Sequence, residues 1–525
     1  VDIPSNWKGK RIELELERVL WQSSVWVDGH KIPYTQESLV TPHTFDLSEF
    51  LTPGKHLISI RVDNREQHHI SDGMAHAYSN ETQIKWNGII GDIKLVAKEN
   101  ISIEDIQIYP DIQNRQIKVI CQIDNIGKES KAVLNVNEDE QSVLLKKGLN
   151  QLILSYKEKD SIRLWSEFSP NLYELNLLVK TRECIDKKTV VYAYRDLDTE
   201  QQKLKLNGNP LYLRGTLECC IFPLTGYPPM EKEGWKKVYY TAREWGLNHL
   251  RFHSWCPPEA AFEVADSMGF YLQVELPLWS SFNKNNLDYL QAEANSILKK
   301  YGNHPSFCLF SMGNELGGDY PLLQEFMAKL KEKDPRHLYT LTSFSFSKYG
   351  EWPDSNSDYF ITQRTRKGWV RGQGVFNVEY PSFDKNYDKS LVDMPVPTIT
   401  HEIGQYAIYP DLKEIKNYKG VLEPLNFKAV KLDLEKKGLI NKANDFLMAS
   451  GKLAALLYKE EIERAMKTVG ISGYQLLDLH DFPGQGTALV GLLNAFWENK
   501  GIVDASFFRQ FCSPIVLLAN FSKAV

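Results

Sequence analysis

The sequence lacks the features that mark several classes of protein. No hydrophobic run reaches about 18 residues, the length from which a membrane-spanning helix is predicted. A formal net charge of −5 gives no positive field that would attract nucleic acid or an anionic membrane surface. The chain begins at Val1 with neither an initiator methionine nor a signal peptide. We therefore expect part of a larger protein with no nucleic-acid or membrane partner, and these residues do not indicate a compartment.

Cysteine is scarce and forms no recognisable site. The seven cysteines are an odd number, lie scattered along the chain and make no CxxC pair or zinc-ligand spacing. We expect buried free thiols rather than a disulfide framework or a metal centre. The glycine-rich segment 481–487 has no following lysine and lacks the pattern of a phosphate-binding loop. Aromatic residues, in contrast, make up 12% of the chain, which suits both sugar-stacking faces and β-sandwich cores.

Short alternating strands separated by turn dipeptides fill the first part of the chain. Asp28-Gly29 and Pro53-Gly54 are turn sequences typical of an antiparallel sandwich. The alternation continues from Ile101 to Tyr194, a length that suits an immunoglobulin-like sandwich of about 100 residues. We predict two sandwiches, one over 1–98 and one over 99–198.

Strands and helices alternate in the rest of the chain. Strict alternation predicts a parallel sheet with crossover helices, and the remaining length suffices for a (β/α)8 barrel over 199–525. Segment 348–394 is expected to be a long loop that shapes a pocket. The predicted strands are 211–215, 248–252 and 270–275, and the predicted helices are 234–245, 258–268 and 286–301.

Two glutamates stand at the ends of predicted barrel strands. Glu315 follows the hydrophobic run 307–310, and Glu402 ends a strand predicted over 397–402. Barrel enzymes carry their functional groups at the C-terminal ends of the strands. A retaining glycosidase needs one carboxylic acid to protonate the leaving oxygen and one carboxylate to attack the anomeric carbon. A single glutamate at a strand end is more often simply solvated, but the pair favours a glycosidase.

The order of two sandwiches and a barrel, joined to these glutamate motifs, resembles glycoside hydrolase family 2, which includes β-galactosidases, β-glucuronidases and β-mannosidases. The most specific similarity is 303–306 (Asn-His-Pro-Ser) followed by 313–315 (Gly-Asn-Glu), which resembles the acid/base motif of the family. The resemblance implies a jelly-roll-like N-terminal sandwich that lacks its opening strands here. Further similar stretches are Val25–Gly29, Phe45–Leu47, Pro53–His56, Trp86–Ile89 and Leu213–Gly215.

The resemblance also implies a role for each matching residue. Glu315 becomes the general acid/base and Glu402 the nucleophile. Asn314 would hold the 2-hydroxyl of the sugar, and Arg251 would lower the pKa of the nucleophile electrostatically. The alternative for Arg251 is an arginine that neutralises a buried glutamate without a catalytic task.

Other candidate residues match the family less closely. His253 and Glu275 lie at strand ends that correspond to family positions, although a lone histidine is equally often a structural polar group. Glu218 follows Arg214-Gly215, where the family commonly has an Asn-His-Glu stretch. The remaining predicted substrate-binding residues are Trp369, Trp497 and Lys500.

Several departures from the family pattern affect the choice of sugar. Leu477 stands where relatives often place a tryptophan under the sugar, and region 358–369 has no tyrosine at the position where relatives often have one that hydrogen-bonds the nucleophile. Glucuronidases read the sugar carboxylate with an Asn-x-Lys motif, and Glu498 replaces its asparagine two residues before Lys500. Because a glutamate repels a uronate, a glucuronide is disfavoured.

We predict a retaining exo-β-glycosidase that removes a terminal non-reducing sugar during polysaccharide degradation, with β-galactosidase-like activity. One alternative is a glycosidase for another equatorial sugar: an α-L-arabinopyranoside, a β-mannoside, a glucosaminide or, less readily, a β-glucuronide. Another is an inactive carbohydrate-binding protein. The chemistry requires no cofactor, although some relatives carry accessory Mg²⁺ or Na⁺. The resemblance further implies a periplasmic or secreted bacterial protein and allows a homo-oligomer.

Overall fold

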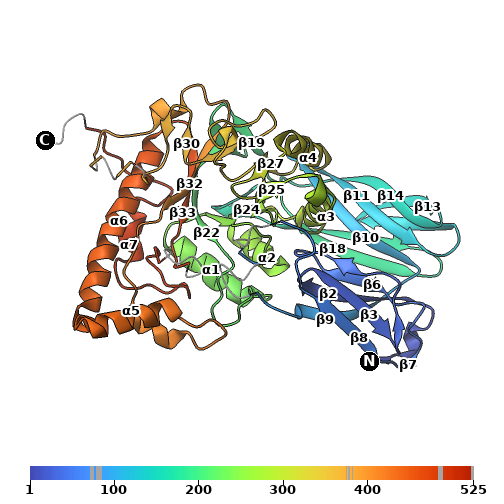
Figure 1. Cartoon of the computed structure of the whole chain (residues 1–525). Coiled ribbons are helices and arrows are strands. Elements are labelled where there is room, and N and C mark those ends of the chain that lie inside the picture. The colour runs from blue at the N-terminus through green and yellow to red at the C-terminus, as the bar shows by residue number, and fades with distance from the viewer. Residues whose placement is uncertain are drawn as a thin grey trace. The chain divides into compact units, whose positions relative to one another are not determined.

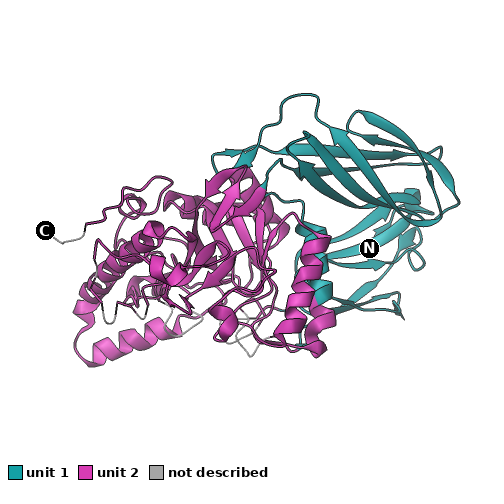
Figure 2. Ribbon diagram, turned by 90° about the horizontal axis from the view of Figure 1, so that it is seen from above, with its two compact units in different colours: residues 1–68, 87–196, 291–305 teal, residues 69–86, 197–290, 306–525 magenta. Residues whose placement is uncertain are grey.

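The computed structural model describes residues 1–70, 76–78, 85–373, 375–376, 379–380, 382–482 and 489–521. Figure 1 shows the ribbon of the chain, and Figure 2 shows its two compact units. The first unit comprises 1–68, 87–196 and 291–305, and the second comprises 69–86, 197–290 and 306–525. Most of the glycine-rich segment 481–487 lies outside the described residues.

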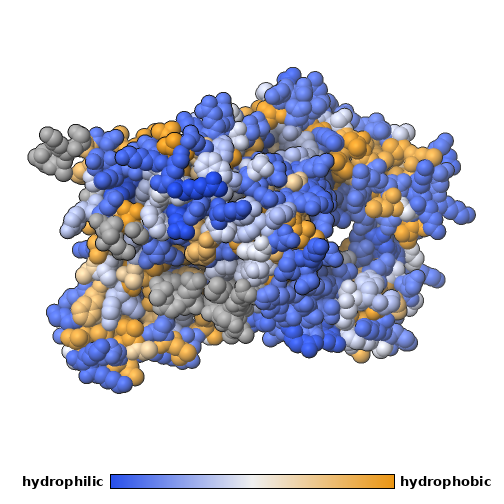
Figure 3. Space-filling model, turned by 45° about the horizontal axis from the view of Figure 1, so that its top comes forward, coloured by the Kyte–Doolittle hydropathy of each residue, from blue (hydrophilic) through white to orange (hydrophobic). Residues whose placement is uncertain are grey.

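The face drawn in Figure 3 carries hydrophilic and hydrophobic residues interspersed. Among the described residues, no helix combines the length and the apolar character needed to cross a membrane.

The first unit begins with a sandwich of short antiparallel strands. Strand β2 (Arg11–Val19) pairs with β6 (His43–Asp46) on one side and β9 (Ile89–Lys98) on the other. Its apolar side chains alternate with polar ones, so one face of the strand enters the core. The second sheet contains β3 (Gln22–Val27), β4 (His30–Lys31), β5 (Gln36–Glu37) and β8 (Ile58–Asp63), and a separate pair joins β1 (Asp2–Ile3) to β7 (Gly54–Lys55).

An immunoglobulin-like sandwich follows in the same unit. Its seven strands form a three-stranded and a four-stranded sheet, as in a constant-type immunoglobulin domain. A continuous core that includes Ile117, Val119, Leu134 and Leu177 fills the sandwich. The first sheet is β10 (Ile101–Asp111), β11 (Gln116–Asn125) and β14 (Gly148–Lys157). The second is β13 (Asp139–Leu145), β12 (Ser130–Val136), β17 (Tyr173–Lys180) and β18 (Ile185–Tyr192).

The second unit contains a nearly closed barrel of eight parallel strands. Most of these strands are buried along their whole length, because parallel sheets are covered on both faces. The two end strands of the sheet, β28 and β29, are joined among the described residues by a single parallel bridge between Ser343, which lies beyond the end of β28, and Ile361 of β29. In chain order the strands are β22 (Leu213–Glu218), β23 (His249–Phe252), β24 (Tyr271–Glu275), β26 (Phe307–Ser311), β28 (Leu338–Thr340), β29 (Phe360–Thr362), β32 (Thr398–Gly404) and β33 (Ile471–Leu477).

Helices α1 and α2 show how local sequence determines where a helix packs and where it ends. In α1, the buried residues Trp235, Val238, Tyr239 and Ala242 recur at helical spacing, which gives the helix one apolar face. Helix α2 ends at Gly269, whose left-handed backbone (φ 71°) suits a residue without a Cβ. The helices are α1 (Lys232–Glu244), α2 (Glu259–Met268), α3 (Lys284–Tyr301), α4 (Tyr320–Lys333), α5 (Leu425–Lys436), α6 (Ala443–Lys467) and α7 (Ala505–Arg509).

The sandwich and barrel classes predicted from the sequence are confirmed, and the predicted barrel elements differ from the observed ones by only a few residues. One expectation needs correction. Segment 348–394 is not a single loop, because it contains the sixth barrel strand, β29. A strand of three residues is too short for an alternation pattern to reveal it. Shorter strands of the second unit include β25 (Ser281–Phe282), β27 (Gly317–Gly318), β30 (Arg364–Thr365) and β31 (Gly368–Trp369).

Candidate active site

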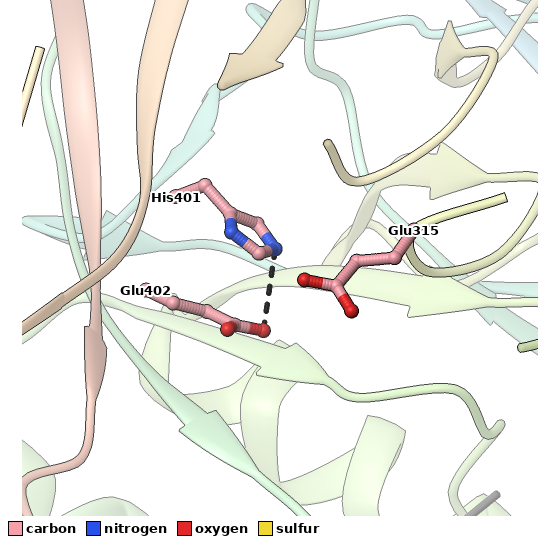
Figure 4. Close-up of side chains that lie close together, drawn as sticks. All are labelled: Glu315, His401 and Glu402. Carbon is pink, nitrogen blue, oxygen red and sulfur yellow. Dashed lines mark ion pairs between the residues drawn. The ribbon is translucent and has the colours of Figure 1, made fainter. Parts of the chain in front are cut away.

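The fold brings Glu315 and Glu402 together at the C-terminal ends of their strands. Glu315 lies in the turn after β26, and Glu402 belongs to β32. With His401 they present one ligand atom each, and these atoms all lie within 4.8 Å of one another. Figure 4 shows the Glu315 side chain extending toward the Glu402 carboxylate. Retaining glycosidases hold their carboxyl groups roughly 5–5.5 Å apart, whereas inverting enzymes separate them by about 6.5–9.5 Å. The proximity of the pair therefore suits retention.

Both glutamates have left-handed backbones. The φ angle is 48° at Glu315 and 50° at Glu402. A residue with a Cβ adopts this conformation uncommonly, and such residues gather at functional sites.

Glu402 is surrounded by hydrogen-bond donors and positive charge. Its Oε1 lies 3.1 Å from His253 Nε2, 3.2 Å from His401 Nε2 and 3.0 Å from Arg251 Nη1. Burial alone would raise the pKa of this carboxyl, but the two histidines and the arginine outweigh that effect and hold the pKa well below its usual range. Glu402 is therefore ionised at neutral pH.

Glu315 has the opposite electrostatic environment. Burial, followed by the negative charge of Glu402, raises the pKa of Glu315 to about 7. The indole nitrogen of Trp279 donates to Glu315 Oε2 over 3.3 Å and orients the carboxyl group. Two carboxyl groups whose pKa values are driven apart are what acid/base and nucleophile roles require.

Arg251 connects Glu402 to the turn that carries Glu315. Its Nη2 donates to Asn314 Oδ1 over 2.6 Å, while its Nη1 faces Glu402. Because Asn314 Oδ1 accepts from Arg251, the amide nitrogen Nδ2 is the remaining donor of this side chain. That nitrogen is buried and has no partner within the described part of the chain, so it can donate to a substrate hydroxyl.

Glu275, predicted to bind substrate, lies fully enclosed as the second anionic partner of Arg251. Arg251 Nε donates to Glu275 Oε1 over 2.7 Å, and the backbone nitrogen of Ser254 donates to Oε2 over 2.9 Å. Gln273 and Ser343 also donate to Oε1. The structure thus gives Glu275 protein partners at both oxygens.

Glu218 and Lys500 are buried near the ends of the first and last barrel strands. Burial raises the pKa of Glu218 to about 7. The nearby His480 acts in the opposite direction, and the charge of Asp478 adds to the increase. Lys500 Nζ pairs with Asp481 Oδ2 over 2.6 Å, and both side chains are only 1% exposed. The charge of Lys500 is therefore already compensated by the protein.

The two predicted tryptophans occupy different environments. Trp497 stacks on the ring of His480 with a centroid distance of 4.4 Å. Trp369 is 40% exposed and lies under the guanidinium of Arg364 at 5.9 Å. Within the described part of the chain, these ring contacts of the two tryptophans do not involve Glu315 or Glu402.

Sequence reasoning assigned no site role to several residues around Glu315 and Glu402, among them His401, Trp279, Arg371 and His76. Trp279 follows β24 by a few residues, and its place after a barrel strand was an available signal. Arg371 is fully buried, and its guanidinium donates to the carbonyl oxygen of His401 over 3.2 Å and to Gln405 Oε1 over 3.0 Å. His76 belongs to a segment between two sandwich strands, so nothing in the sequence placed it near the barrel.

Glu315, His401 and Glu402 are close enough together to hold a metal ion. However, Glu402 Oε1 already faces three donors, and Arg251 places a permanent positive charge 3.0 Å from that oxygen. A divalent cation bound there would be repelled at close range. These residues do not fit a catalytic metal, and the expectation that no cofactor is required stays a prediction.

Comparisons with known proteins agree with the sandwich and barrel architecture. The family model described as glycosyl hydrolases family 2 matches residues 101–195. The β-galactosidase large subunit of Latilactobacillus sakei is 25% identical over 366 residues, which are 64% of this chain and 56% of that protein. A β-galactosidase of Thermoanaerobacter pseudethanolicus is 26% identical over 62% of this chain and 45% of its own length. The chain thus spans about half the length of these two relatives.

Solved structures show the same fold. A family 2 β-galacturonidase from Eisenbergiella tayi, bound to galacturonate, superposes with a TM-score of 0.72 at 16% identity and covers 97% of this chain and 88% of its own. A Bacteroides uniformis β-glucuronidase reaches the same TM-score at 16% identity, over 99% of this chain and 63% of that one. With two sandwiches, an eight-stranded barrel, a family model matched over residues 101–195 and these relatives, the chain is similar in sequence and architecture to glycoside hydrolase family 2 proteins.

Proposed function

We propose that this chain forms the catalytic part of a retaining exo-β-glycosidase. The observation that supports this most directly is the pair Glu315 and Glu402, whose ligand atoms approach within 4.8 Å and whose pKa values are shifted in opposite directions. An acid that stays protonated to about pH 7 faces a carboxylate that stays ionised. This is the arrangement that double displacement requires.

The reaction proceeds in two steps. In the first, a Glu402 oxygen bonds to the anomeric carbon while the bond from that carbon to the leaving oxygen breaks, and Glu315 gives its proton to that oxygen. In the second, the Glu315 carboxylate takes a proton from water as the water oxygen attacks the anomeric carbon and releases Glu402. Glu315 is then protonated again, and the configuration of the sugar is retained.

The surrounding residues stabilise this sequence of states. Arg251 keeps Glu402 ionised before attack and faces the leaving carboxylate when Glu402 is released. The Asn314 amide nitrogen supplies a donor for the 2-hydroxyl, a contact that strengthens as the transition state develops.

We propose a neutral galactose-like sugar as the substrate. The two curated relatives described above are named β-galactosidases, whereas one of Formosa agariphila, 25% identical, is named a putative β-glucuronidase. The solved uronidases are similar in fold at 16% identity. Because Lys500 is paired with Asp481 in a buried ion pair, it has no uncompensated charge for a sugar carboxylate. Another equatorial sugar, such as α-L-arabinopyranose, presents the same ring configuration and is the alternative.

A panel of nitrophenyl glycosides tests the function. We expect the β-galactoside to give the highest kcat/KM, the β-glucuronide to be poor, and proton NMR to show the β-anomer as the first product. Glu402→Gln should lower kcat by at least roughly 10⁴-fold, and the exposed Glu423→Gln serves as the matched control. Sugar binding without turnover of any glycoside would instead identify an inactive carbohydrate-binding protein, and α-anomer as first product would exclude retention.

A further inference from the structure

Segment 69–86 connects two sandwich strands in the sequence, β8 and β9, but belongs to the second compact unit. Two of its backbone carbonyls are bound by residues that follow barrel strand β24. Asn286 Nδ2 donates to the oxygen of His69 over 3.1 Å, and the backbone nitrogen of Trp279 donates to the oxygen of Ile70 over 2.9 Å. The segment is thereby attached directly to Trp279.

The imidazole of His76, in the same segment, is packed among rings. Its centroid lies 4.4 Å from that of His253, 5.2 Å from that of Trp279 and 4.6 Å from that of Phe482. His76 is only 1% exposed. The ring therefore occupies an enclosed space in which its shape determines how its neighbours lie.

Two of these neighbours hold the catalytic carboxyl groups directly. His253 Nε2 lies 3.1 Å from Glu402 Oε1, and Trp279 Nε1 donates to Glu315 Oε2 over 3.3 Å. We propose that His76 is a positioning residue that sets the nucleophile and the acid/base relative to each other through His253 and Trp279. This inference rests on the proposed glycosidase function.

An aromatic ring suits this position because flat faces and edges constrain the neighbouring rings. The His76 and Phe482 planes meet at 90°, and the His76 and Trp279 planes meet at 62°, which are edge-on arrangements. If the ring were removed, both His253 and Trp279 would gain space toward the cavity left behind. A misplacement of about 1 Å in a catalytic group costs up to roughly 10²-fold in rate.

The protonation state of His76 agrees with a packing role. Burial, and next the neighbouring His253, lower the pKa of His76 well below its usual value, so the ring is neutral at neutral pH. A neutral ring adds no charge that would compete with Arg251 for Glu402. The residue therefore acts through its volume and ring contacts.

Three variants test the proposal: His76→Ala, His76→Phe and, as a control, His43→Ala. His43 is also a buried histidine (1% exposed), but it lies in the N-terminal sandwich and contacts Ser23. We expect His76→Ala to lower kcat/KM on the nitrophenyl sugar by about 10- to 100-fold, mainly through kcat. His76→Phe keeps a ring and should stay within about threefold of wild type, and His43→Ala should affect the thermal midpoint but not kcat.

The leaving group separates positioning from a general loss of structure. Because Trp279 orients the acid, His76→Ala should lose more activity on a methyl glycoside, which needs protonation, than on a dinitrophenyl glycoside. Equal losses on both substrates, equal losses in His76→Phe and His76→Ala, or unchanged kinetics in His76→Ala would each overturn the proposal. If the alanine variant does not fold, His76→Gln removes the same ring contacts. No turnover by wild type would defeat the proposed function and this inference together, whereas unaffected turnover in the variant defeats the inference alone.

Discussion

Arg251 and Glu402 form a buried ion pair in which Nη1 lies 3.0 Å from Oε1 and the arginine side chain has no exposed surface. The same guanidinium binds Glu275 and Asn314. One positive charge thus offsets two carboxylates and also orients the Asn314 amide beside Glu315. Both carboxylates depend on this charge, because Glu275 has no exposed side-chain surface and Glu402 only 8%.

Replacing Arg251 with methionine should destabilise the protein by about 3–5 kcal/mol, because Glu275 and Glu402 would be left buried without a compensating charge. Thermal or urea unfolding would measure the loss. The exposed Arg182→Met variant is the control and should change stability by less than about 0.5 kcal/mol. An Arg251→Met protein as stable as wild type would show that the carboxylates find other partners or become protonated.

The activity should fall as the pH rises through the pKa of Glu315. That pKa is raised to about 7, and the first step needs the protonated form, so kcat/KM should decrease about tenfold per pH unit above this value. A pH profile of kcat/KM on a substrate with a poor leaving group would measure this decreasing alkaline limb. In Glu315→Gln, assayed on an activated dinitrophenyl substrate, the limb should disappear. A limb centred near pH 4 would contradict the assigned environment of Glu315.

The Asn314 amide should contribute chiefly to the transition state. Because Nδ2 is the donor left for the 2-hydroxyl, Asn314→Ala should lower kcat by roughly 10²- to 10³-fold on a normal sugar. A 2-deoxy sugar lacks the hydroxyl, so the same substitution should lower kcat for that sugar much less. Comparing kcat for both sugars in both proteins isolates the contact. Equal losses for the two sugars would mean that Asn314 acts only by supporting Arg251.

Glu293 on α3 offers a stability test away from the catalytic centre. Burial raises the pKa of Glu293 from its ordinary value of 4.5 to about 7, although its Oε2 accepts from the backbone nitrogen of Leu39 over 3.1 Å. The folded protein therefore retains this proton more strongly than the unfolded chain. Stability from this group is complete below pH 4.5 and is lost as the pH rises through about 7, by up to about 1.4 kcal/mol per unit.

Glu293→Gln remains neutral and can still accept from Leu39, so its thermal midpoint should rise relative to wild type between pH 5 and pH 8. The exposed Glu332→Gln is the matched control and should show no such trend. A difference from wild type that is independent of pH would contradict a buried, proton-retaining carboxyl.

The residues that sequence reasoning could find are those whose function follows from local position. Glu315 and Glu402 each stand at the end of a recognisable buried strand, and parallel strands of a barrel present their ends on one face. Asn314 is adjacent to Glu315 in the chain. Trp369 was predicted from its place in the region that resembles the sixth strand of the family, and the hairpin of β30 and β31 leaves it 40% exposed. Local position alone does not determine where a long connection directs its side chains.

The sequence by itself determined the order of the domains, the barrel strands long enough to show periodicity, and two carboxyl groups on one face. Only the tertiary structure decided their chemistry. The pKa values of Glu315 and Glu402 diverge because burial and the charge of Glu402 raise the pKa of Glu315, whereas two histidines and Arg251 outweigh burial at Glu402. Most of these effects depend on distances between strands remote in the chain. His76 reaches the same centre from a sandwich connection that carries no pattern of its own. Packing and electrostatic effects depend on the three-dimensional distances between side chains, and the order of residues in the chain does not specify those distances.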